Sequence, residues 1–217
     1  MLFPLLTLWT IYFILHSVLA SLSVKRWFSQ QFPVAMVYYR LGFNLFSFAL
    51  LLPLLAWTLW LGQQQPLLLH WQGGWYWFAK SLNLTAFILF LSTLLYYDLS
   101  HFLGIKQYQQ GSSPIDDNAC FSLSPLHRWV RHPWYSLGLI MLWTHNMDIH
   151  LLSVALLTHV YLIIGLYFEE QKLHHQFGKT YLRYTLAVPA LIPRPWRYLS
   201  RVQATQLINT EINSNEN

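Results

Sequence analysis

The sequence predicts an all-α, polytopic integral membrane protein with about five membrane helices, the last two forming a helical hairpin followed by a cytoplasmic C-terminal segment. Three observations predict this fold. Of the 217 residues, 55% are hydrophobic and only 10% are charged, whereas an ordinary soluble domain has about 25% charged residues. Several apolar runs reach the roughly 20 residues that a spanning helix needs. The formal net charge of +5 comes from basic residues that flank these runs, which argues for membrane topology and against nucleic-acid binding.

The first three apolar runs are Leu2–Leu22, Leu41–Leu61 and Trp75–Tyr97. A fourth apolar region, Pro133–Phe168, is interrupted by "THNMDIH", in which Asn and Asp favour a turn. We therefore expect a hairpin whose first arm has about 12 residues, too few to cross the bilayer unaided. Its second arm, Leu151–Phe168, is long enough to span.

The positions of Lys and Arg predict the orientation of these segments. Lys80 alone falls on one side of the predicted membrane, and twelve basic residues fall on the other: Lys25, Arg26, Arg40, Lys106, Arg128, Arg131, Lys172, Lys179, Arg183, Arg194, Arg197 and Arg201. Placing the larger group in the cytoplasm requires five segments, with the N-terminus outside and the C-terminus inside. Both ends of the hairpin then lie at the cytoplasmic face, so Arg131 and His132 should be near Glu169 and Glu170.

We expect a single domain over residues 1–200. Residues 201–217 are largely polar and are predicted to be a disordered tail. Cys120 is the one cysteine, so the chain can form no intramolecular disulfide, and no metal site is predicted.

Two stretches carry the chemistry, "VRHPWYSLG" (130–138) and "LYFEEQKL" (166–173). Pro133 suits a first helical turn, and the free N–H groups there, beside Arg131, form an anion site for a carboxylate or phosphate. Glu169 and Glu170 complement it by binding an ammonium group or ribose hydroxyls. S-adenosylmethionine has such groups, and its adenine can stack on Trp134, Tyr135 or Tyr167. The alternative is that Arg131 only marks topology and the two glutamates only pair with neighbouring cations.

The C-terminal third resembles the membrane methyltransferases that include isoprenylcysteine carboxyl methyltransferase and phospholipid methyltransferases. The resemblance is carried by "RHPWYSLG", "EEQKL", "FGKTYLRY" and "VPALIP". It implies an S-adenosylmethionine site without a Rossmann fold, and the chain has no G-x-G-x-x-G motif. By position, the cofactor contacts would involve Arg131, His132, Tyr135, Gly138, Glu169 and Glu170, with Tyr181 and Tyr184 in support. The chain departs from the family at Pro125-Leu126-His127, where Gly-x-Tyr is common.

The upstream stretches "LHSVLASLSVKRWF", "YRLGFNL" and "DLSHFLGIKQ" are similar to the bacterial methanethiol S-methyltransferase branch. This resemblance implies methylation of a small thiol, methanethiol, to dimethyl sulfide, in a bacterial inner membrane. Membrane lipid and a small thiol or lipophilic acceptor are the implied partners. Polar residues inside predicted spans usually face the protein interior, and the candidates for the acceptor pocket are His16, Asn44, Asn83, Asp98, His101 and Phe102. A thiol attacks as the thiolate, and the candidate bases are Glu170, His132 and His101.

Other functions remain open from the sequence. The N-terminal pattern also resembles a denitrification-associated membrane family related to the haem-dependent zeta-carotene isomerase. In that case two of His16, His101, His127 and His132 would be axial ligands. A prenylcysteine carboxylate or phospholipid amine is an alternative acceptor, and a non-catalytic membrane scaffold is a third possibility.

Overall fold

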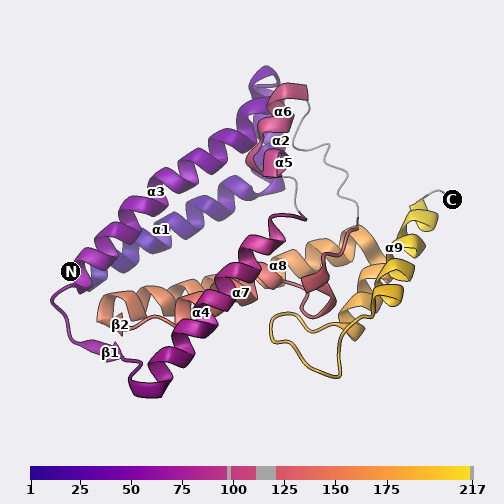
Figure 1. The fold of residues 1–217 in the computed structure, drawn as a ribbon. Coiled ribbons are helices and arrows are strands. Elements are labelled where there is room, and N and C mark those ends of the chain that lie inside the picture. Colours follow the sequence, from indigo (N-terminus) through magenta and orange to yellow (C-terminus); the bar gives the residue numbers. More distant parts are fainter. Residues whose placement is uncertain (97–98, 111–120, 216–217) are drawn as a thin grey trace. The chain divides into compact units, whose positions relative to one another are not determined.

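The computed structural model describes residues 1–96, 99–110 and 121–215, and helices predominate among them (Figure 1). The elements in chain order are α1 (Leu2–Ala20), α2 (Leu22–Gln31), η1 (Val34–Tyr38), α3 (Tyr39–Gly62), β1 (Leu67–Leu69), α4 (Gly73–Thr93), α5 (Leu99–Leu103), α6 (Ile105–Gln110), η2 (Pro125–Arg128), α7 (Pro133–Trp143), β2 (Met147–Asp148), α8 (Ile149–Ala187) and α9 (Arg201–Asn215).

The chain divides into two compact units that alternate along the sequence. The first unit contains residues 1–70, the described part of 97–118, and 146–158. The second contains residues 71–96, the described part of 119–145, and 159 onward. The expected single domain over residues 1–200 stays a prediction.

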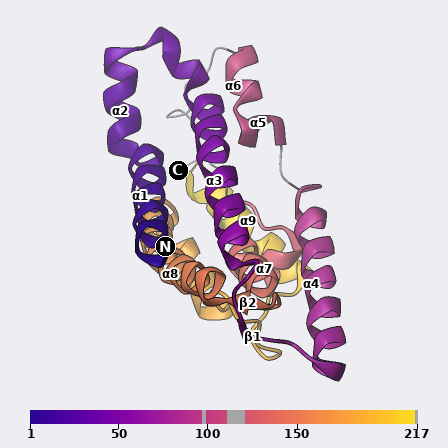
Figure 2. The ribbon, with the colours of Figure 1, turned by 90° about the vertical axis from the view of Figure 1, so that its left-hand side faces the viewer.

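In the first unit, α1 packs along α3 (Figures 1 and 2). Trp9 on α1 donates its indole N–H to the hydroxyl of Thr58 on α3 at 3.0 Å, and both side chains are buried. A buried indole N–H needs such an acceptor. Ser21 ends α1 in an extended conformation, and its hydroxyl accepts the N–H of Val24 at the start of α2. This cap separates the apolar α1 from the basic α2.

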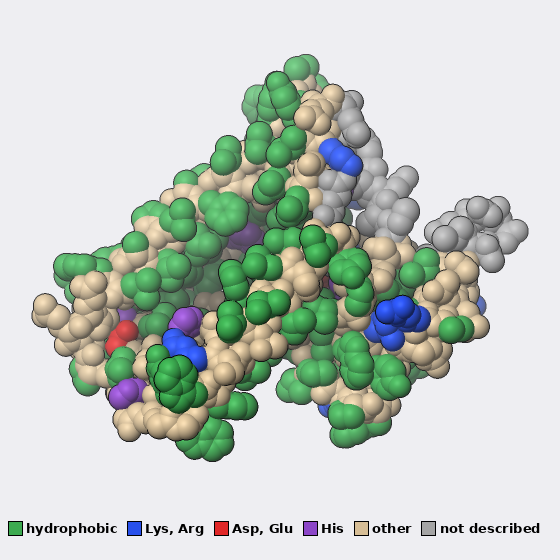
Figure 3. All heavy atoms as spheres, in the orientation of Figure 1, with side chains coloured by type: hydrophobic (Ala, Val, Ile, Leu, Met, Phe, Trp, Pro, Cys, Tyr) green, Lys and Arg blue, Asp and Glu red, His purple; other side chains and the backbone are tan. Residues whose placement is uncertain are grey.

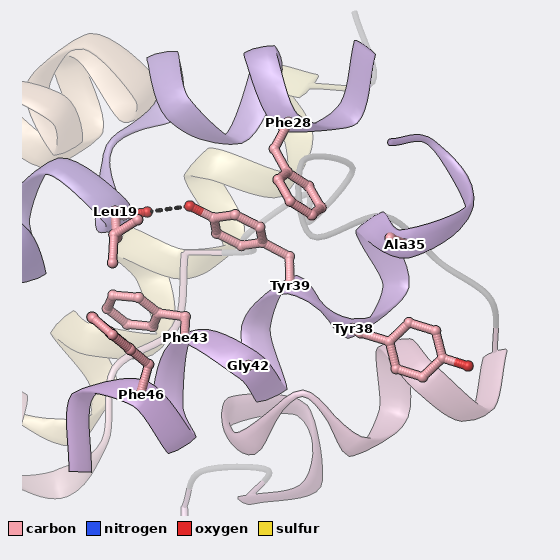
Figure 4. Close-up of a pocket in the computed structure, with 8 residues that line it drawn as sticks. All are labelled: Leu19, Phe28, Ala35, Tyr38, Tyr39, Gly42, Phe43 and Phe46. Atoms are coloured by element: carbon pink, nitrogen blue, oxygen red, sulfur yellow. Dashed lines mark hydrogen bonds between the residues drawn. The ribbon is translucent and has the colours of Figure 1, made fainter. Parts of the chain in front are cut away.

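An open apolar pocket of about 450 Å³ lies where α1, α2, η1 and α3 of this unit meet (Figure 4). The hydroxyl of Tyr39 donates to the carbonyl of Leu19 at 2.7 Å and ties α3 to the end of α1. The lining residues are Leu19, Phe28, Ala35, Tyr38, Tyr39, Gly42, Phe43 and Phe46.

The first unit also contains a two-stranded antiparallel sheet that the sequence did not predict. Leu67 pairs with Asp148, and Leu69 pairs with Met147. The side chain of Asp148 accepts the backbone N–H of His150 at 2.7 Å, which caps the start of α8. The helix break between α7 and α8 therefore falls inside the "THNMDIH" stretch, where the turn was expected.

In the second unit, α4 and α7 run antiparallel. Near the middle of α4, the side-chain amide of Asn83 donates to the carbonyl of Met141 at 3.1 Å and to the hydroxyl of Thr144 at 2.7 Å. At the other end of the pair, the indole N–H of Trp134 donates to the hydroxyl of Thr93 at 2.8 Å. Asn83, a candidate for the acceptor pocket, thus joins two helices.

Helix α8 continues well past Phe168, where the second hairpin arm was expected to end, and reaches Ala187. Its backbone is interrupted at Gly178, which has φ 47° and ψ −121°. A residue with a Cβ is strongly disfavoured in that conformation. The glycine therefore lets the last turns of α8 change direction, and the candidate site depends on this change.

Residues Arg201–Asn215 form helix α9, although the sequence predicted a disordered tail over this segment. Ser200 and Gln203 make a capping box, in which each side chain bonds the backbone N–H of the other residue at 3.2 and 2.8 Å. Ala204, Leu207 and Ile208 have helical i, i+3, i+4 spacing and pack against a cluster formed by Phe121, Tyr181, Tyr184, Val188 and Leu199. This short apolar stripe was hidden by the polar composition of the tail.

Among the described residues, three helical segments are long and apolar enough to cross a membrane: Leu2–Ala20, Val34–Gly62 and Ile149–Ala187. Large apolar side chains are exposed along α3 (Figure 3), among them Leu45, Phe48, Leu52 and Leu59. The expected span Trp75–Tyr97 overlaps α4 (Gly73–Thr93), which is not among the three. Helix α7 has 11 residues, a length of roughly 16 Å.

Candidate functional site

Arg131 and Glu170 form a two-point ion pair in the second unit. The guanidinium Nε donates to Oε1 at 2.9 Å, and Nη2 donates to Oε2 at 2.8 Å. The two side chains are 12% and 17% exposed. Arg131 immediately precedes α7 and Glu170 lies in α8, so the two sequence stretches singled out for their chemistry are neighbours, as expected.

His132 lies between the two carboxylates. Its Nε2 is 2.6 Å from Oε1 of Glu170, and its Nδ1 is 3.3 Å from Oε2 of Glu169. Burial by itself lowers the pKa of His132, but the hydrogen bonds and charges of the two glutamates outweigh burial and raise the pKa above its usual value. With neither ring nitrogen free of a carboxylate, the geometry does not favour His132 as a haem ligand.

The remaining guanidinium nitrogen of Arg131, Nη1, donates to two backbone carbonyls near the end of α8, Thr185 at 3.3 Å and Val188 at 2.5 Å. The backbone N–H groups of Arg131 and His132 donate to the carbonyls of Pro189 and Ala190 at 2.9 and 3.1 Å. The "VPALIP" stretch therefore holds the start of α7 in place. The guanidinium of Arg131 therefore has internal partners on all its nitrogens, and the expected contact of Arg131 with a ligand anion stays a prediction.

Tyr181 completes the shell around Glu170 by donating its hydroxyl to Oε1 at 2.8 Å. These two residues are 11 positions apart, which in a straight helix is about 16 Å along the axis. The bond therefore depends on the break at Gly178. Tyr184 lies further out and donates its hydroxyl to the carbonyl of His127 at 2.6 Å, so its contact with the cluster is through the ring of Tyr181.

Glu169 is the accessible carboxylate of the cluster, with a side chain that is 43% exposed. Tyr135 hydrogen-bonds it from the first turn of α7, and the rings of Tyr135 and His132 stack with centroids 5.6 Å apart. The Tyr135 hydroxyl also lies 3.8 Å from the position of a Cβ on Gly165 in α8. A Cβ on Gly138 would meet nothing within 4 Å, so there is open space one turn further along α7.

The stretch at Pro125-Leu126-His127, where the chain departs from the related methyltransferases, forms η2. The Nδ1 of His127 is 2.7 Å from the hydroxyl of Ser124. Burial, and then the charge of His132, lower the pKa of His127 to about 4, against a smaller opposing effect of Glu169. His127 is therefore neutral at physiological pH.

The sequence did not identify the side chains that hold the backbone around this cluster through hydrogen bonds to carbonyl groups. The Arg128 side chain donates to the carbonyl of Leu199 at 2.9 Å, and the Ser136 hydroxyl donates to that of Leu191 at 2.7 Å. Arg197 donates to the carbonyls of Thr185 and Leu186 at 2.9 and 2.6 Å. From the sequence, Arg128 and Arg197 were interpreted only as topology signals. Nothing in the residues around them distinguishes an arginine that binds distant carbonyls from one that only marks the cytoplasmic side.

Of the residues expected in the acceptor pocket, His16, Asn44, His101 and Phe102 lie in the first unit and Asn83 lies in the second. Arg40 Nη1 donates to the Nδ1 of His101 and to its carbonyl, at 3.3 and 3.0 Å. The amide of Asn44 donates to the carbonyls of Phe102 and Leu103 at 3.1 and 3.3 Å. Because a guanidinium only donates, the Nδ1 lone pair of His101 points at Arg40. This arrangement fastens α5 to α3 and does not favour His101 as a base.

Gln107 and Arg40 belong to this cluster and were missed in the sequence. The buried amide of Gln107, in the orientation that satisfies it, accepts from Nε2 of His101 at 3.1 Å and from Arg40 at 3.0 Å. His16 packs between the rings of Tyr12 and Phe43, with centroids 6.1 and 5.1 Å away. Asp98, the remaining candidate, lies outside the described residues. The cofactor candidates thus lie together in the second unit, with Asn83, whereas the other described acceptor candidates lie in the first.

Comparison with known proteins finds several relatives that share one name. Methanethiol S-methyltransferase 2 of Bradyrhizobium diazoefficiens is 30% identical over 193 residues, covering 87% of this chain and 72% of that protein. Methanethiol S-methyltransferase of Pseudomonas deceptionensis is 30% identical over 201 residues, covering 85% and 70%. That of Pseudomonas sp. strain GM41 is 31% identical over 188 residues, covering 82% and 68%. No family model and no solved structure matches the chain.

Proposed function

Because the chain belongs to the methanethiol S-methyltransferase family, we propose that it transfers a methyl group from S-adenosylmethionine to methanethiol, which forms dimethyl sulfide. Family membership is the observation that carries this proposal. The cluster around Glu170 supports it, because it joins the segments that resemble the cofactor-binding elements of related membrane methyltransferases.

S-adenosylmethionine supplies a methyl group on a positively charged sulfur. The residues beside Glu169 suit such a molecule. The exposed carboxylate of Glu169 can bind its ammonium group or ribose hydroxyls, and the open space at Gly138 gives room for it beside Tyr135. The two cations Arg131 and His132 balance the two carboxylates, so the cluster carries no large net charge that would repel the cofactor.

We assign Glu170 a positioning role. Its carboxylate accepts from Arg131 twice, from His132 and from Tyr181, and a carboxylate stabilised by that many donors is a weak base. Glu170 therefore orients His132, and His132 in turn orients Glu169. Substitution of Glu170 should act through the shape of the site, whereas substitution of Glu169 should act on the ligands directly.

The methyl transfer needs a thiolate, since the thiol itself is a poor nucleophile. Because Glu169 is assigned to the cofactor and, like Glu170, accepts hydrogen bonds from its neighbours, we propose that the thiol gives its proton to water at the mouth of the site. The thiol sulfur then forms its bond to the methyl carbon while the bond between that carbon and the sulfonium breaks, and the electron pair stays on the departing sulfur. Held positions and exclusion of water supply much of the rate enhancement in such a displacement.

We also propose the five-segment topology, with the N-terminus outside and the C-terminus in the cytoplasm of a bacterial inner membrane. The twelve basic residues on one side support it. In this arrangement the cofactor reaches Glu169 from the cytoplasm, while a small apolar thiol can arrive from the bilayer.

The function is tested by headspace detection of dimethyl sulfide from the purified full-length protein with methanethiol and methyl-labelled S-adenosylmethionine. Labelled dimethyl sulfide is expected, and it should be lost in Glu169→Gln and retained in His175→Ala, an exposed residue of the same helix. A parallel assay uses a prenylcysteine acceptor. Product only in that assay would refute the thiol acceptor, and no methyl transfer to either acceptor would refute the proposed activity.

A further inference from the structure

The apolar pocket of the first unit is poorly suited to the thiol. Its lining residues include no acid, histidine or lysine, and the hydroxyl of Tyr39 is already bonded to the carbonyl of Leu19. No lining group can therefore take a proton from a thiol. A volume of about 450 Å³ is within the usual range for sites that hold much larger organic ligands and exceeds the needs of methanethiol, with two heavy atoms.

The place of the pocket in the chain points to the membrane boundary. Leu19 is in the last turn of α1, and Tyr39 to Phe46 form the first two turns of α3. Both helices belong to segments that can span a bilayer, so the pocket lies at their ends (Figure 4). Trp27, Phe32 and Val34 on the connecting segment are 56%, 51% and 86% exposed. Exposed aromatic residues beside span ends are typical of the interface between lipid and water.

The charge of this region is of one sign. Lys25 and Arg26 lie on α2, and no acidic residue occurs in the sequence before Asp98. Lys25 is three residues from Phe28, so helical spacing puts it on the side of α2 that lines the pocket. A ligand here meets apolar walls next to a cationic helix, which is the complement of an acyl chain joined to an anionic headgroup.

We propose that the pocket holds an acyl chain of an anionic phospholipid, with the lipid phosphate beside Lys25 and Arg26. Figure 4 shows that the pocket-lining rings of Phe28, Tyr39 and Phe43 come from two different helices, so a bound chain would contact both α2 and α3. The lipid thereby stabilises the first unit. This site is independent of the proposed methyl transfer.

Gly42 provides a specific test, because it lines the pocket and a Cβ there would meet nothing within 4 Å. In Gly42→Leu the new Cβ has open space, the rest of the side chain occupies part of the pocket, and leucine favours the helix. Gly74→Leu is the matched control, since Gly74 also has open space around a Cβ but lies in α4. The full-length protein is placed in phosphatidylcholine nanodiscs that contain phosphatidylglycerol with a photoreactive acyl chain. Adducts are mapped by mass spectrometry after irradiation.

Adducts are expected on Phe28, Tyr39 and Phe43, with loss of this labelling in Gly42→Leu and not in Gly74→Leu. Photoreactive phosphatidylcholine should label these residues less, and Lys25→Gln with Arg26→Gln should remove the difference between the two lipids. If adducts form only at exposed positions such as Leu52 and are unchanged in Gly42→Leu, the proposal that a lipid chain occupies the pocket is wrong. Equal labelling by both lipids in the unaltered protein would refute the preference for an anionic headgroup.

Discussion

The guanidinium of Arg131 and the carboxylate of Glu170 share two hydrogen bonds, of 2.9 and 2.8 Å, across 39 residues of sequence. Arg131 also binds the carbonyls of Thr185 and Val188, and Glu170 also binds His132 and Tyr181. One ion pair thus connects the start of α7 to both the middle and the end of α8, which gives it consequences for stability as well as for function.

The first prediction concerns that stability. Arg131→Ala leaves a largely buried carboxylate without its main partner, and the free energy of unfolding should fall by about 3 kcal/mol or more. Arg131→Lys should recover only part of the loss, because a lysine cannot make the two-point contact. Chemical denaturation of the detergent-solubilised protein measures both. Arg183→Ala, which alters an exposed arginine of α8, is the control and should change stability little.

The second prediction separates the two glutamates. Glu169→Gln should weaken S-adenosylmethionine binding roughly tenfold to a hundredfold, the loss of one charge-assisted hydrogen bond, and should leave stability nearly unchanged. Glu170→Gln should reduce both affinity and stability, because it breaks the contacts of Arg131, His132 and Tyr181. Calorimetric titration with thermal unfolding of the same samples tests this. Equal stability losses in the two variants would contradict the separate roles.

The third prediction is a pH dependence. The folded-state pKa of His132 is raised, so its contribution to stability is complete below the usual histidine value of about 6.5 and is lost as the pH rises through the folded-state pKa. His132→Gln should therefore cost more unfolding free energy at pH 6 than at pH 9. Denaturant titrations at the two pH values give the comparison, and a larger cost at pH 9 would refute the protonated imidazole.

His127 should behave in the opposite way. Its folded-state pKa is lowered to about 4, so its contribution is present above the usual histidine value and is lost as the pH falls towards 4. In nitrogen NMR spectra of histidine-labelled protein, the imidazole assigned through His127→Gln should remain neutral at pH 5.5. A resonance that titrates near pH 6.5 would disagree with the buried environment seen for this ring.

The next prediction is for the break in α8. Gly178→Ala forces a Cβ into a conformation with φ 47°, at a cost of about 1–2 kcal/mol or more. If α8 straightens instead, Tyr181 loses Glu170, so affinity for S-adenosylmethionine should also fall. Gly74→Ala is the control, because it adds the same methyl group to a helix without strain and should be neutral or stabilising. Comparable losses in the two variants would mean that the break at Gly178 is not required.

The sequence by itself determined the approximate positions of α1, α3, α4 and α7 and the start of α8, and it predicted that Arg131 and His132 lie near Glu169 and Glu170. Apolar runs, the proline at the start of α7 and the turn residues before α8 are local signals, and a helix responds to local signals. The distribution of basic residues brought Arg131 and Glu170 to one predicted membrane face, and the ion pair agrees with that expectation. The apolar stripe and capping box of α9 were equally local and were masked by the polar composition around them.

Only the tertiary structure decided what each polar side chain binds. Arg131, the expected anion-binding residue, binds Glu170 and two carbonyls, and Nδ1 of His101, a candidate base, faces Arg40. The pairing of β1 with β2 and the exposure of Glu169 were likewise absent from the sequence pattern. The physical reason is that a buried polar group must be satisfied by whichever donor or acceptor the fold brings to it, and that partner lies tens of residues away, where no local spacing records it.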